Sequence, residues 1–200
     1  KLNGGEEVPY EVNISLYDAL SGTISEGKDE YQNVRFIVAH TILLALEGIP
    51  AFYIHSLLAT ENSNELYKQT GMPRSINRYK WDHDQLSETL VDEKSHHKYI
   101  FQELKRRIKI RRMQPAFHPN ATQLTLHLGD KLFAFWRESL DRHQSVFVLN
   151  NISSEPVAFS LHELNLIDTE NWRDLLTGTV YLSSQDEVVL DPYQTVWISN

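Results

Sequence analysis

The sequence predicts an α/β fold over residues 1–114 followed by an all-β fold over residues 115–200. In the first part, a stretch with helical apolar spacing (29–47) leads directly into a short apolar run (49–54), which is one step of an α/β layout. In the second part, after Pro115, the apolar residues recur with a period of two and short strand-like runs follow one another. These two patterns define the predicted architecture.

Composition excludes several classes of protein. With 41% hydrophobic and 10% aromatic residues, a chain of 200 residues can bury a substantial core. A formal net charge of -8 opposes binding to nucleic acid or to an anionic membrane surface. The chain has no cysteine, so disulfides and thiolate chemistry are absent, and with no export signal at its start we expect a cytoplasmic protein.

The stretch 29–47 contains no glycine or proline, and its apolar residues cover most of the helix circumference, as expected for a core helix. Gly48 stands where a left-handed residue ends a helix, and Pro50 prevents continuation. The run Ile49–Ile54 is nearly uninterrupted in its apolar character, which predicts a strand buried on both faces of a parallel sheet.

Residues 55–92 show no steady period and predict a long loop. Such a loop after the carboxyl end of a parallel strand is typical of a binding surface. Helical spacing resumes over 93–113, with Ile100, Leu104 and Ile108 on one face.

The all-β part predicts an antiparallel sandwich or barrel. Its first strand contains the alternating Leu124, Leu126 and Leu128 and begins near Thr122. The further predicted strands are Lys131–Trp136, Ser145–Leu149, Val157–Leu161, Val180–Leu182, Glu187–Leu190 and Thr195–Ile198.

Four segments of the sequence are distinctive. They are YEVNISLYDAL (Tyr10–Leu20), RFIVAHTILLALEGIPAFYIHSLLATENS (Arg35–Ser63), PRSINR (Pro73–Arg78) and QPAFHPNATQLTLHLG (Gln114–Gly129), of which PRSINR is the most specific. Together they resemble the sucrose-phosphorylase subgroup of the α-amylase superfamily, and especially its glucosylglycerate-phosphorylase-like members. The resemblance implies that residues 1–114 are the last α/β units and the active-site loop of a (β/α)₈ barrel, and that residues 115–200 are the antiparallel β-sandwich, domain C.

The same resemblance implies that the catalytic carboxylates are not in this chain. Family members use an Asp nucleophile, a Glu acid/base and a further stabilising Asp, all upstream of the segment that Tyr10 begins. His83 and Asp84 form a His-Asp dipeptide, but they follow the eighth strand, whereas the family's pair precedes the seventh helix. We therefore expect no catalytic residue here, and a chain that is part of a longer enzyme and inactive alone.

Five residues are candidates for substrate binding. Arg74 matches the first arginine of the family motif, which reaches the glucose subsite, and a guanidinium offers several fixed donors to sugar hydroxyls. Arg78 shares that motif but could equally pin the loop. His55 and Glu61 follow the predicted strand end, and Trp81 could stack on a sugar, although a half-buried imidazole and ordinary aromatic packing explain His55 and Trp81 as well.

Metal and nucleic-acid sites are not expected. The nine histidines lack ligand spacing, and the adjacent His96 and His97 cannot share a helix face. The basic cluster Lys105–Arg112 complements the carboxyl end of a helix and needs no partner. No cofactor is predicted.

The favoured function is transfer of an α-glucosyl group from a glucoside, glucosylglycerate or sucrose, to phosphate in the full-length enzyme. The expected partners are the α-glucoside, inorganic phosphate, and either the missing barrel part or a second copy of the chain. Two alternatives stay open: a hydrolase or transglycosylase of the same superfamily, and a non-catalytic carbohydrate-binding or interaction module.

Overall fold

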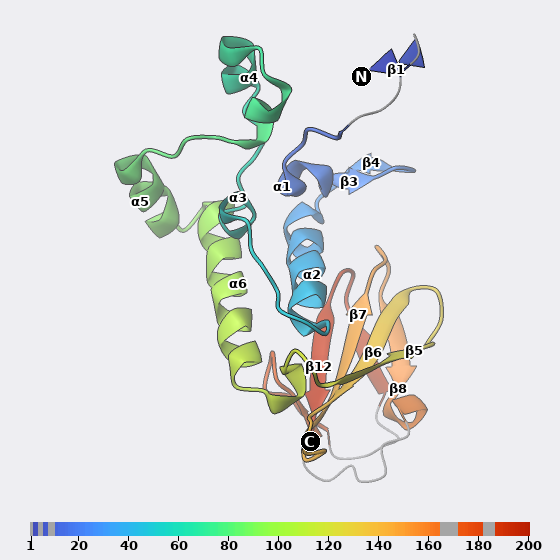
Figure 1. Ribbon diagram of the computed structural model, residues 1–200. Coiled ribbons are helices and arrows are strands. Elements are labelled where there is room, and N and C mark those ends of the chain that lie inside the picture. The colour runs from blue at the N-terminus through green and yellow to red at the C-terminus, as the bar shows by residue number, and fades with distance from the viewer. Residues whose placement is uncertain (1, 4–5, 8–10, 165–171, 182–186) are drawn as a thin grey trace.

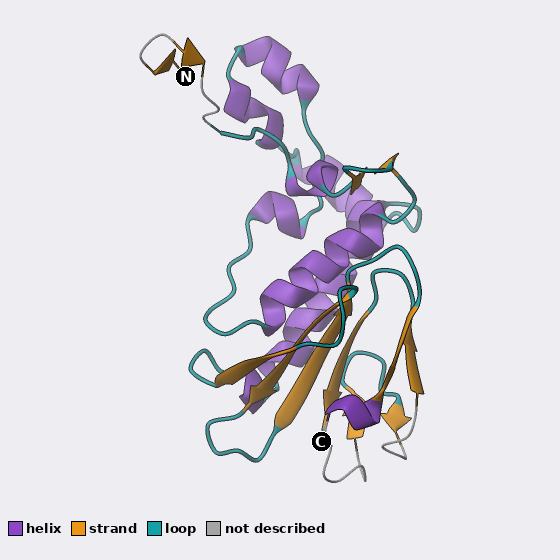
Figure 2. Cartoon of the chain, turned by 90° about the vertical axis from the view of Figure 1, so that its right-hand side faces the viewer, coloured by secondary structure: helices purple, strands orange, loops and turns teal. Residues whose placement is uncertain are grey.

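A computed structural model describes residues 2–3, 6–7, 11–164, 172–181 and 187–200. A layer of helices stands on one face of a β-sheet, and a smaller sheet lies against the other face (Figures 1 and 2). None of the helices in the described part of the chain has both the length and the apolar character that crossing a bilayer requires.

The helical elements are α1 (Leu16–Ala19), α2 (Gln32–Ala45), α3 (Ile54–Leu57), α4 (Asn64–Thr70), η1 (Pro73–Asn77), α5 (His83–Val91), α6 (His96–Arg112), η2 (Pro115–Phe117) and η3 (Leu161–Leu164). The strands are β1 (Leu2–Asn3), β2 (Glu6–Glu7), β3 (Gly22–Thr23), β4 (Gly27–Lys28), β5 (Thr122–Leu126), β6 (Leu132–Glu138), β7 (Ser145–Asn151), β8 (Val157–Ser160), β9 (Trp172–Asp174), β10 (Val180–Tyr181), β11 (Glu187–Leu190) and β12 (Thr195–Ser199).

The two long helices, α2 and α6, pack side by side, as Figure 1 shows. Their contact is built on Phe36 and Ile37 from α2 and on Ile100 and Leu104 from α6, all buried, as the apolar spacing predicts. Tyr17 from α1 completes this cluster with its ring edge against Phe36, the two centroids being 5.4 Å apart.

The large sheet is antiparallel, with strand order β10-β9-β12-β7-β6-β5, and a separate pair, β11-β8, covers part of one face. Between the two sheets lies a core to which β6, β7, β8, β11 and β12 all contribute. The predicted sandwich and its start near Thr122 are therefore confirmed, since β5 begins at that residue.

The other face of the large sheet is covered by the carboxyl end of α2 and by η2. Leu44 and Ala45 pack with Phe117, Phe135 and Trp197, all buried. Because both faces are covered, every residue of β12 is buried, and β7 is buried at all positions but its first. The apolar runs in these central strands are consequently uninterrupted rather than alternating.

Two arginines supply donors to the carboxyl end of α2, whose last carbonyls have no partner within the helix. Arg111 from α6 donates its Nε–H to the carbonyl of Leu44 at 2.6 Å, and Arg137 from β6 donates from Nη1 to that of Ala45 at 2.7 Å. Arg137 is fully buried and also donates to the carbonyl of His118 at 2.8 Å. The helix layer is thus hydrogen-bonded directly to the sheet layer.

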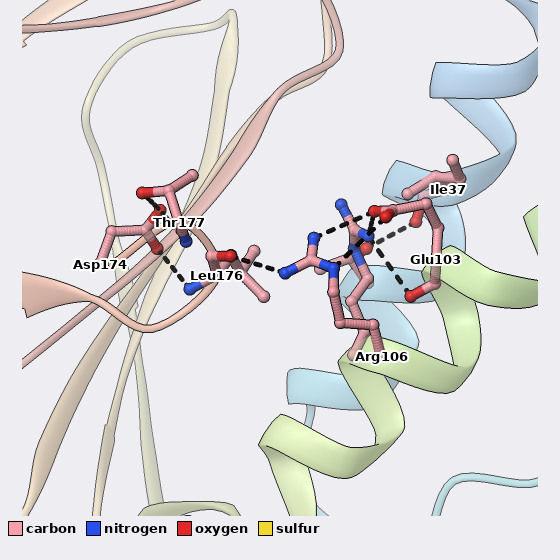
Figure 3. A network of polar contacts seen from close by, with 8 residues as sticks. Ile37, Glu103, Arg106, Asp174, Leu176 and Thr177 are labelled. Carbon is pink, nitrogen blue, oxygen red and sulfur yellow. Dashed lines mark hydrogen bonds and ion pairs between the residues drawn. The ribbon is translucent and has the colours of Figure 1, made fainter. Parts of the chain in front are cut away.

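A second link joins α6 to the turn after β9, as Figure 3 shows. Arg106 donates from Nη1 to the carbonyl of Leu176 at 2.6 Å and pairs with Glu103 on its own helix. The turn itself is held by the buried carboxylate of Asp174, which accepts hydrogen bonds from the backbone N–H groups of Leu176 and Trp197 at 3.1 and 2.8 Å. This turn therefore holds the carbonyl of Leu176 in place to accept the hydrogen bond from Arg106 on α6.

The prediction of a strand over Ile49–Ile54 is wrong. Residues 49–53 are extended but form no strand, and α3 begins at Ile54. The reason is that no strand in the described residues lies beside this segment to complete a ladder, and Ile49 and Tyr53 are 84% and 53% exposed. The predicted turn at Gly48 is confirmed by its φ of 91°.

The predicted long loop over 55–92 is also wrong in part, because it contains α3, α4, η1 and α5. Of these, α4 and α5 are short and mostly polar, and the side chains of their N-cap residues, Ser63 and Asp82, rather than an apolar period mark where they begin. The predicted helices 29–47 and 93–113 are present with shorter bounds, as α2 and α6. Strand β9 was not predicted, and residue 182 of the predicted strand Val180–Leu182 lies outside the described residues.

We predict that Arg137→Met lowers the free energy of unfolding by roughly 3 kcal/mol, since it keeps the aliphatic stem but leaves buried carbonyls without a donor. The measurement is urea unfolding. Arg112→Met is the matched control, because Arg112 is an exposed residue of the last turn of α6 and its loss should change little. Equal losses in the two variants would contradict the role assigned to Arg137.

Candidate functional site

A pocket of about 480 Å³ opens beyond the extended segment 49–53. Its walls come from the chain between α3 and α4, from the first turn of α4, from the segment between η1 and α5, from α5 itself, and from the first turn of α6. The lining residues are Thr60, Glu61, Asn62, Ser63, Asn64, Glu65, Tyr79, Trp81, Gln85, Thr89 and His97. All are polar or aromatic, so the pocket suits a ligand that forms hydrogen bonds.

Local sequence signals shape these walls. Ser63 caps α4 by accepting from the backbone N–H of Leu66 at 3.2 Å, and α4 ends at Gly71, whose φ is 64°. Asp82 caps α5 by accepting from two backbone N–H groups. Ala59, fully buried and with a φ of 49°, turns the chain immediately before the pocket.

Thr60 is the centre of the pocket's aromatic wall. The indole N–H of Trp81 donates to Oγ1 of Thr60 at 3.0 Å, and Nδ1 of His55 lies 3.2 Å from the same oxygen. Trp81 meets Tyr79 and His97 edge to face, with ring centroids 5.0 and 5.1 Å apart. These contacts fix the orientation of the indole.

His97 is held by the backbone of the opposite wall. Its Nδ1 lies 2.7 Å from the carbonyl oxygen of Leu58, and since a carbonyl can only accept, Nδ1 carries the proton. In neutral His97, Nε2 is then an acceptor.

The segment containing α1 is hydrogen-bonded to the chain around the pocket. The backbone N–H of Ser15 donates to Oδ1 of Asn62 at 2.7 Å, and the backbone N–H of Asn62 donates to Oδ2 of Asp18 at 2.7 Å. Asn77 in turn donates to the carbonyl of Ile14 at 3.4 Å. Asn62 in the pocket wall is therefore hydrogen-bonded to the segment of α1 through both its backbone and its side chain.

Arg74 and Arg78 do not line the pocket. Arg74 donates from Nε and Nη2 to the two carboxylate oxygens of Glu11 at 2.8–3.1 Å, a forked pair that is partly exposed. These hydrogen bonds from Arg74 hold the pKa of the Glu11 carboxyl below its usual range. Arg78 is exposed.

The structure thus brings three of the five predicted residues together. Glu61 and Trp81 line the pocket, and His55 reaches it through Thr60. Sequence reasoning missed Tyr79 and His97. The alternation of aromatic Tyr79 and Trp81 just before the capping Asp82 was a usable signal, whereas His97 enters only because α6 packs behind the pocket.

Burial determines the protonation of the nearby histidines. Burial lowers the pKa of His55, and burial together with the neighbouring His97 lowers that of His96. His96 stacks on Tyr17 with ring centroids 4.7 Å apart, and burial raises the pKa of that tyrosine to about 12. Within the described residues, no group of three or more His, Asp or Glu side chains could hold a metal ion.

Comparison with solved structures shows the fold. The structure superposes on the α-amylase of Geobacillus thermoleovorans in complex with acarbose with a TM-score of 0.66 at 16% identity, covering 94% of this chain and 36% of that one. It superposes on trehalose-6-phosphate hydrolase of Bacillus licheniformis with a TM-score of 0.60 at 16% identity, covering 90% and 40%. The predicted fold class, the carboxyl-terminal part of a (β/α)₈ barrel followed by domain C, is confirmed.

Sequence comparison is more specific, although no protein-family model matches the chain. It is 36% identical over 191 residues to glucosylglycerate phosphorylase of Allomeiothermus silvanus, covering 96% of this chain and 31% of the relative. It is 31% identical over 194 residues to glucosylglycerate phosphorylase of Escherichia coli, covering 97% and 33%. Sucrose phosphorylase of Agrobacterium vitis matches at 30% identity over 109 residues, covering 54% and 19%.

The chain belongs to the sucrose-phosphorylase subgroup of the α-amylase superfamily. It corresponds to a C-terminal portion of these enzymes and spans about a third of the length of the glucosylglycerate phosphorylases that it matches. The resemblance drawn from PRSINR and its companion segments is therefore confirmed.

We predict that this chain loses stability as the pH falls below about 6.5, because its buried histidines stay neutral while those of the unfolded chain take up protons. A histidine whose pKa is lower in the folded state causes no loss of stability at a pH above its unfolded-state pKa. It causes a growing loss of stability as the pH falls below that value. His96→Phe keeps the stacking on Tyr17 and removes one such group, so its urea midpoint should fall less between about pH 7.5 and about pH 5.

The control for this measurement is His83→Asn, because the side chain of His83 is 91% exposed. We expect it to retain the parent's pH dependence. If His96→Phe retained it too, the pKa of His96 would not be lowered in the folded state.

Proposed function

We propose that the chain is the C-terminal portion of a retaining glycoside phosphorylase that transfers an α-glucosyl group from glucosylglycerate, or from sucrose, to inorganic phosphate, giving α-glucose 1-phosphate. The observation that carries this proposal is the match of 96–97% of the chain to three relatives named glucosylglycerate phosphorylase. The match to a sucrose phosphorylase covers 54% of the chain and supports the same class of reaction.

In this proposal the chain contributes substrate binding rather than the reacting carboxylates. Retaining transfer needs a carboxylate nucleophile and a carboxylic proton donor on opposite sides of the scissile bond. We assign both to the roughly two thirds of the relatives' length that this chain does not cover, and we therefore expect the 200 residues alone to be inactive.

Arg74 is proposed to bind the glucosyl group. Its forked contact with Glu11 supports this role, because it leaves the guanidinium beside a carboxylate in an exposed position, with planar donors oriented by a partner. His55, Glu61 and Trp81 are proposed as further substrate-binding residues, and Arg78 as an auxiliary residue of the same motif.

Exposed apolar side chains support a partner for the helical layer. Leu43, Ile49, Tyr53 and Ile54 are 38%, 84%, 53% and 54% exposed, and the last three lie close together in the chain, in the segment 49–53 and at the start of α3. We propose that the rest of the barrel covers them in the full-length enzyme. Self-association of the isolated chain is the alternative that the same surface allows.

We predict that the full-length enzyme cleaves glucosylglycerate faster than sucrose and only when phosphate is present. The substrate preference follows from the higher identity and coverage of the glucosylglycerate phosphorylases among the relatives. Release of α-glucose 1-phosphate, measured with each glucoside, tests both parts. A preference for sucrose would reassign the substrate, and glucose release independent of phosphate would favour a hydrolase.

We predict that Arg74→Lys in the full-length enzyme lowers turnover more than tenfold, or by about 1.4 kcal/mol of transition-state stabilisation, because an ammonium lacks the planar fork of donors. The exposed Arg112→Lys on α6 is the matched control and should leave turnover unchanged. Identical phosphorolysis kinetics in both variants would give Arg74 a purely structural role.

A further inference from the structure

A second cavity lies where α2, α6 and the turns of the β-sandwich meet. Its volume is about 240 Å³, and it shares no lining residue with the candidate pocket. Ile37 and Val38 from α2, both buried, give it an apolar floor. Arg106 and Arg107 from α6 and Gln194, directly before β12, are part of its polar wall. The cavity therefore exists only when the helix layer and the sandwich are packed together.

The arginines of this cavity carry more positive charge than their protein partners balance. One carboxylate, that of Glu103, pairs with both Arg106 and Arg107. Asp191, an acidic residue of the lining, is exposed and forms no ion pair in the described part of the chain. The side chain of Arg107 is only 12% exposed, so water compensates its charge weakly. A bound anion would supply the missing negative charge.

Several hydrogen-bond donors at the cavity have no acceptor among the described residues. The Nε–H of Arg107 is buried without a partner, and its Nη2 group donates to no described residue. The side-chain oxygen of Gln194 accepts from the backbone N–H of Asp191 at 2.7 Å, whereas its amide N–H₂ is unpaired. The hydroxyl of Tyr193 accepts from Nη2 of Arg35 at 3.2 Å, which leaves its own proton available. Buried donors without acceptors are rare in proteins and indicate a water, an ion or a ligand.

The cavity lies on the side of α2 that faces away from the extended segment 49–53. The ring of His40 stacks on Phe52 of that segment, with centroids 5.5 Å apart. Val38, which lines the cavity, is two residues from His40 and therefore lies roughly 160° from it around the helix. The rest of the barrel, proposed above to cover the segment 49–53, would lie on the other side of α2. This placement favours a dissolved anion over an acidic side chain of the rest of the barrel.

We propose that this cavity binds a small oxyanion, a phosphate or a carboxylate group, between α6 and the turn before β12. Arg107 supplies the positive charge, and Gln194 and Tyr193 supply neutral donors. The bound anion bridges the helix layer and the sandwich, which Arg106 already joins through its hydrogen bond to the carbonyl of Leu176. The proposal does not rest on the proposed function, because none of these residues is assigned a part in it.

The test is hydrogen exchange of the full-length enzyme, measured by mass spectrometry in peptides that cover residues 174–179 and 190–195. The backbone N–H groups of Thr177 and Gln194 in these turns are hydrogen-bonded, so their exchange reports opening of the cavity wall. The probes are inorganic phosphate and acetate, with sodium chloride at equal ionic strength and glycerol as reference solutes.

We expect saturable slowing of exchange in both peptides, by about tenfold at a probe concentration of about ten times its Kd. Slowing by phosphate alone assigns the site to phosphate groups, by acetate alone to carboxylates, and by both to oxyanions in general. No slowing by either probe would overturn the proposal, and it is the result expected if an acidic side chain fills the cavity. Equal slowing by sodium chloride, or slowing confined to peptides around Pro73–Arg78, would overturn it as well.

A charge reversal at the cavity wall sharpens the test. Gln194→Glu keeps the oxygen that accepts from Asp191 and replaces the free donor by a negative charge, so the affinity for the probe should fall at least about tenfold. Gln69→Glu is the matched control, because Gln69 is an exposed residue of α4 outside the cavity lining. Equal affinities in the two variants would contradict binding at this cavity.

Removal of the positive charge gives an independent check. Arg107→Gln should abolish the slowing, whereas Arg112→Gln at the exposed end of α6 should preserve it. Urea unfolding shows whether the Arg107 variant is folded, and if it is not, Gln194→Glu decides alone. A folded Arg107→Gln variant that binds the probe with unchanged affinity would overturn the proposal.

Discussion

The carboxyl end of α2 imposes the constraint on which the rest of the structure depends. Its last carbonyls lie in the interior, where water cannot satisfy them, and leaving them unpaired would cost about 1–3 kcal/mol each. Arg111 from α6 and Arg137 from β6 supply the donors. Because these arginines come from a helix and from the sheet, satisfying one helix end fixes the relative position of both layers.

The position of the candidate site follows from these contacts of the end of α2 with α6 and the sheet. The chain leaves α2 after Ala45, turns at Gly48, runs extended over 49–53 and reaches the pocket through α3 and Thr60. At the other side, α6 carries His97 to the pocket and Arg111 to the end of α2. A single helix thus connects the buried polar contacts at the sheet with the polar wall of the pocket.

The sequence predicted the elements that local rules determine. Apolar spacing located α2 and α6, and the change of period located β5, because these signals reflect which side chains are buried. The prediction of a strand over 49–54 was wrong because, within the described residues, no strand lies beside this segment to pair with it. The pocket could be predicted only in part: Trp81 stood beside a recognisable motif, whereas His97 reaches the wall through helix packing, which spacing does not reveal.

The arginine contacts make the helix layer and the sheet one cooperative unit. Native-state hydrogen exchange tests it directly, by comparing the opening free energies of amides in α2 with those in β7 and β12. We expect the slowest amides of all three elements to share one opening free energy. Amides of α2 that all exchange at a clearly lower free energy than those of the sheet would contradict it.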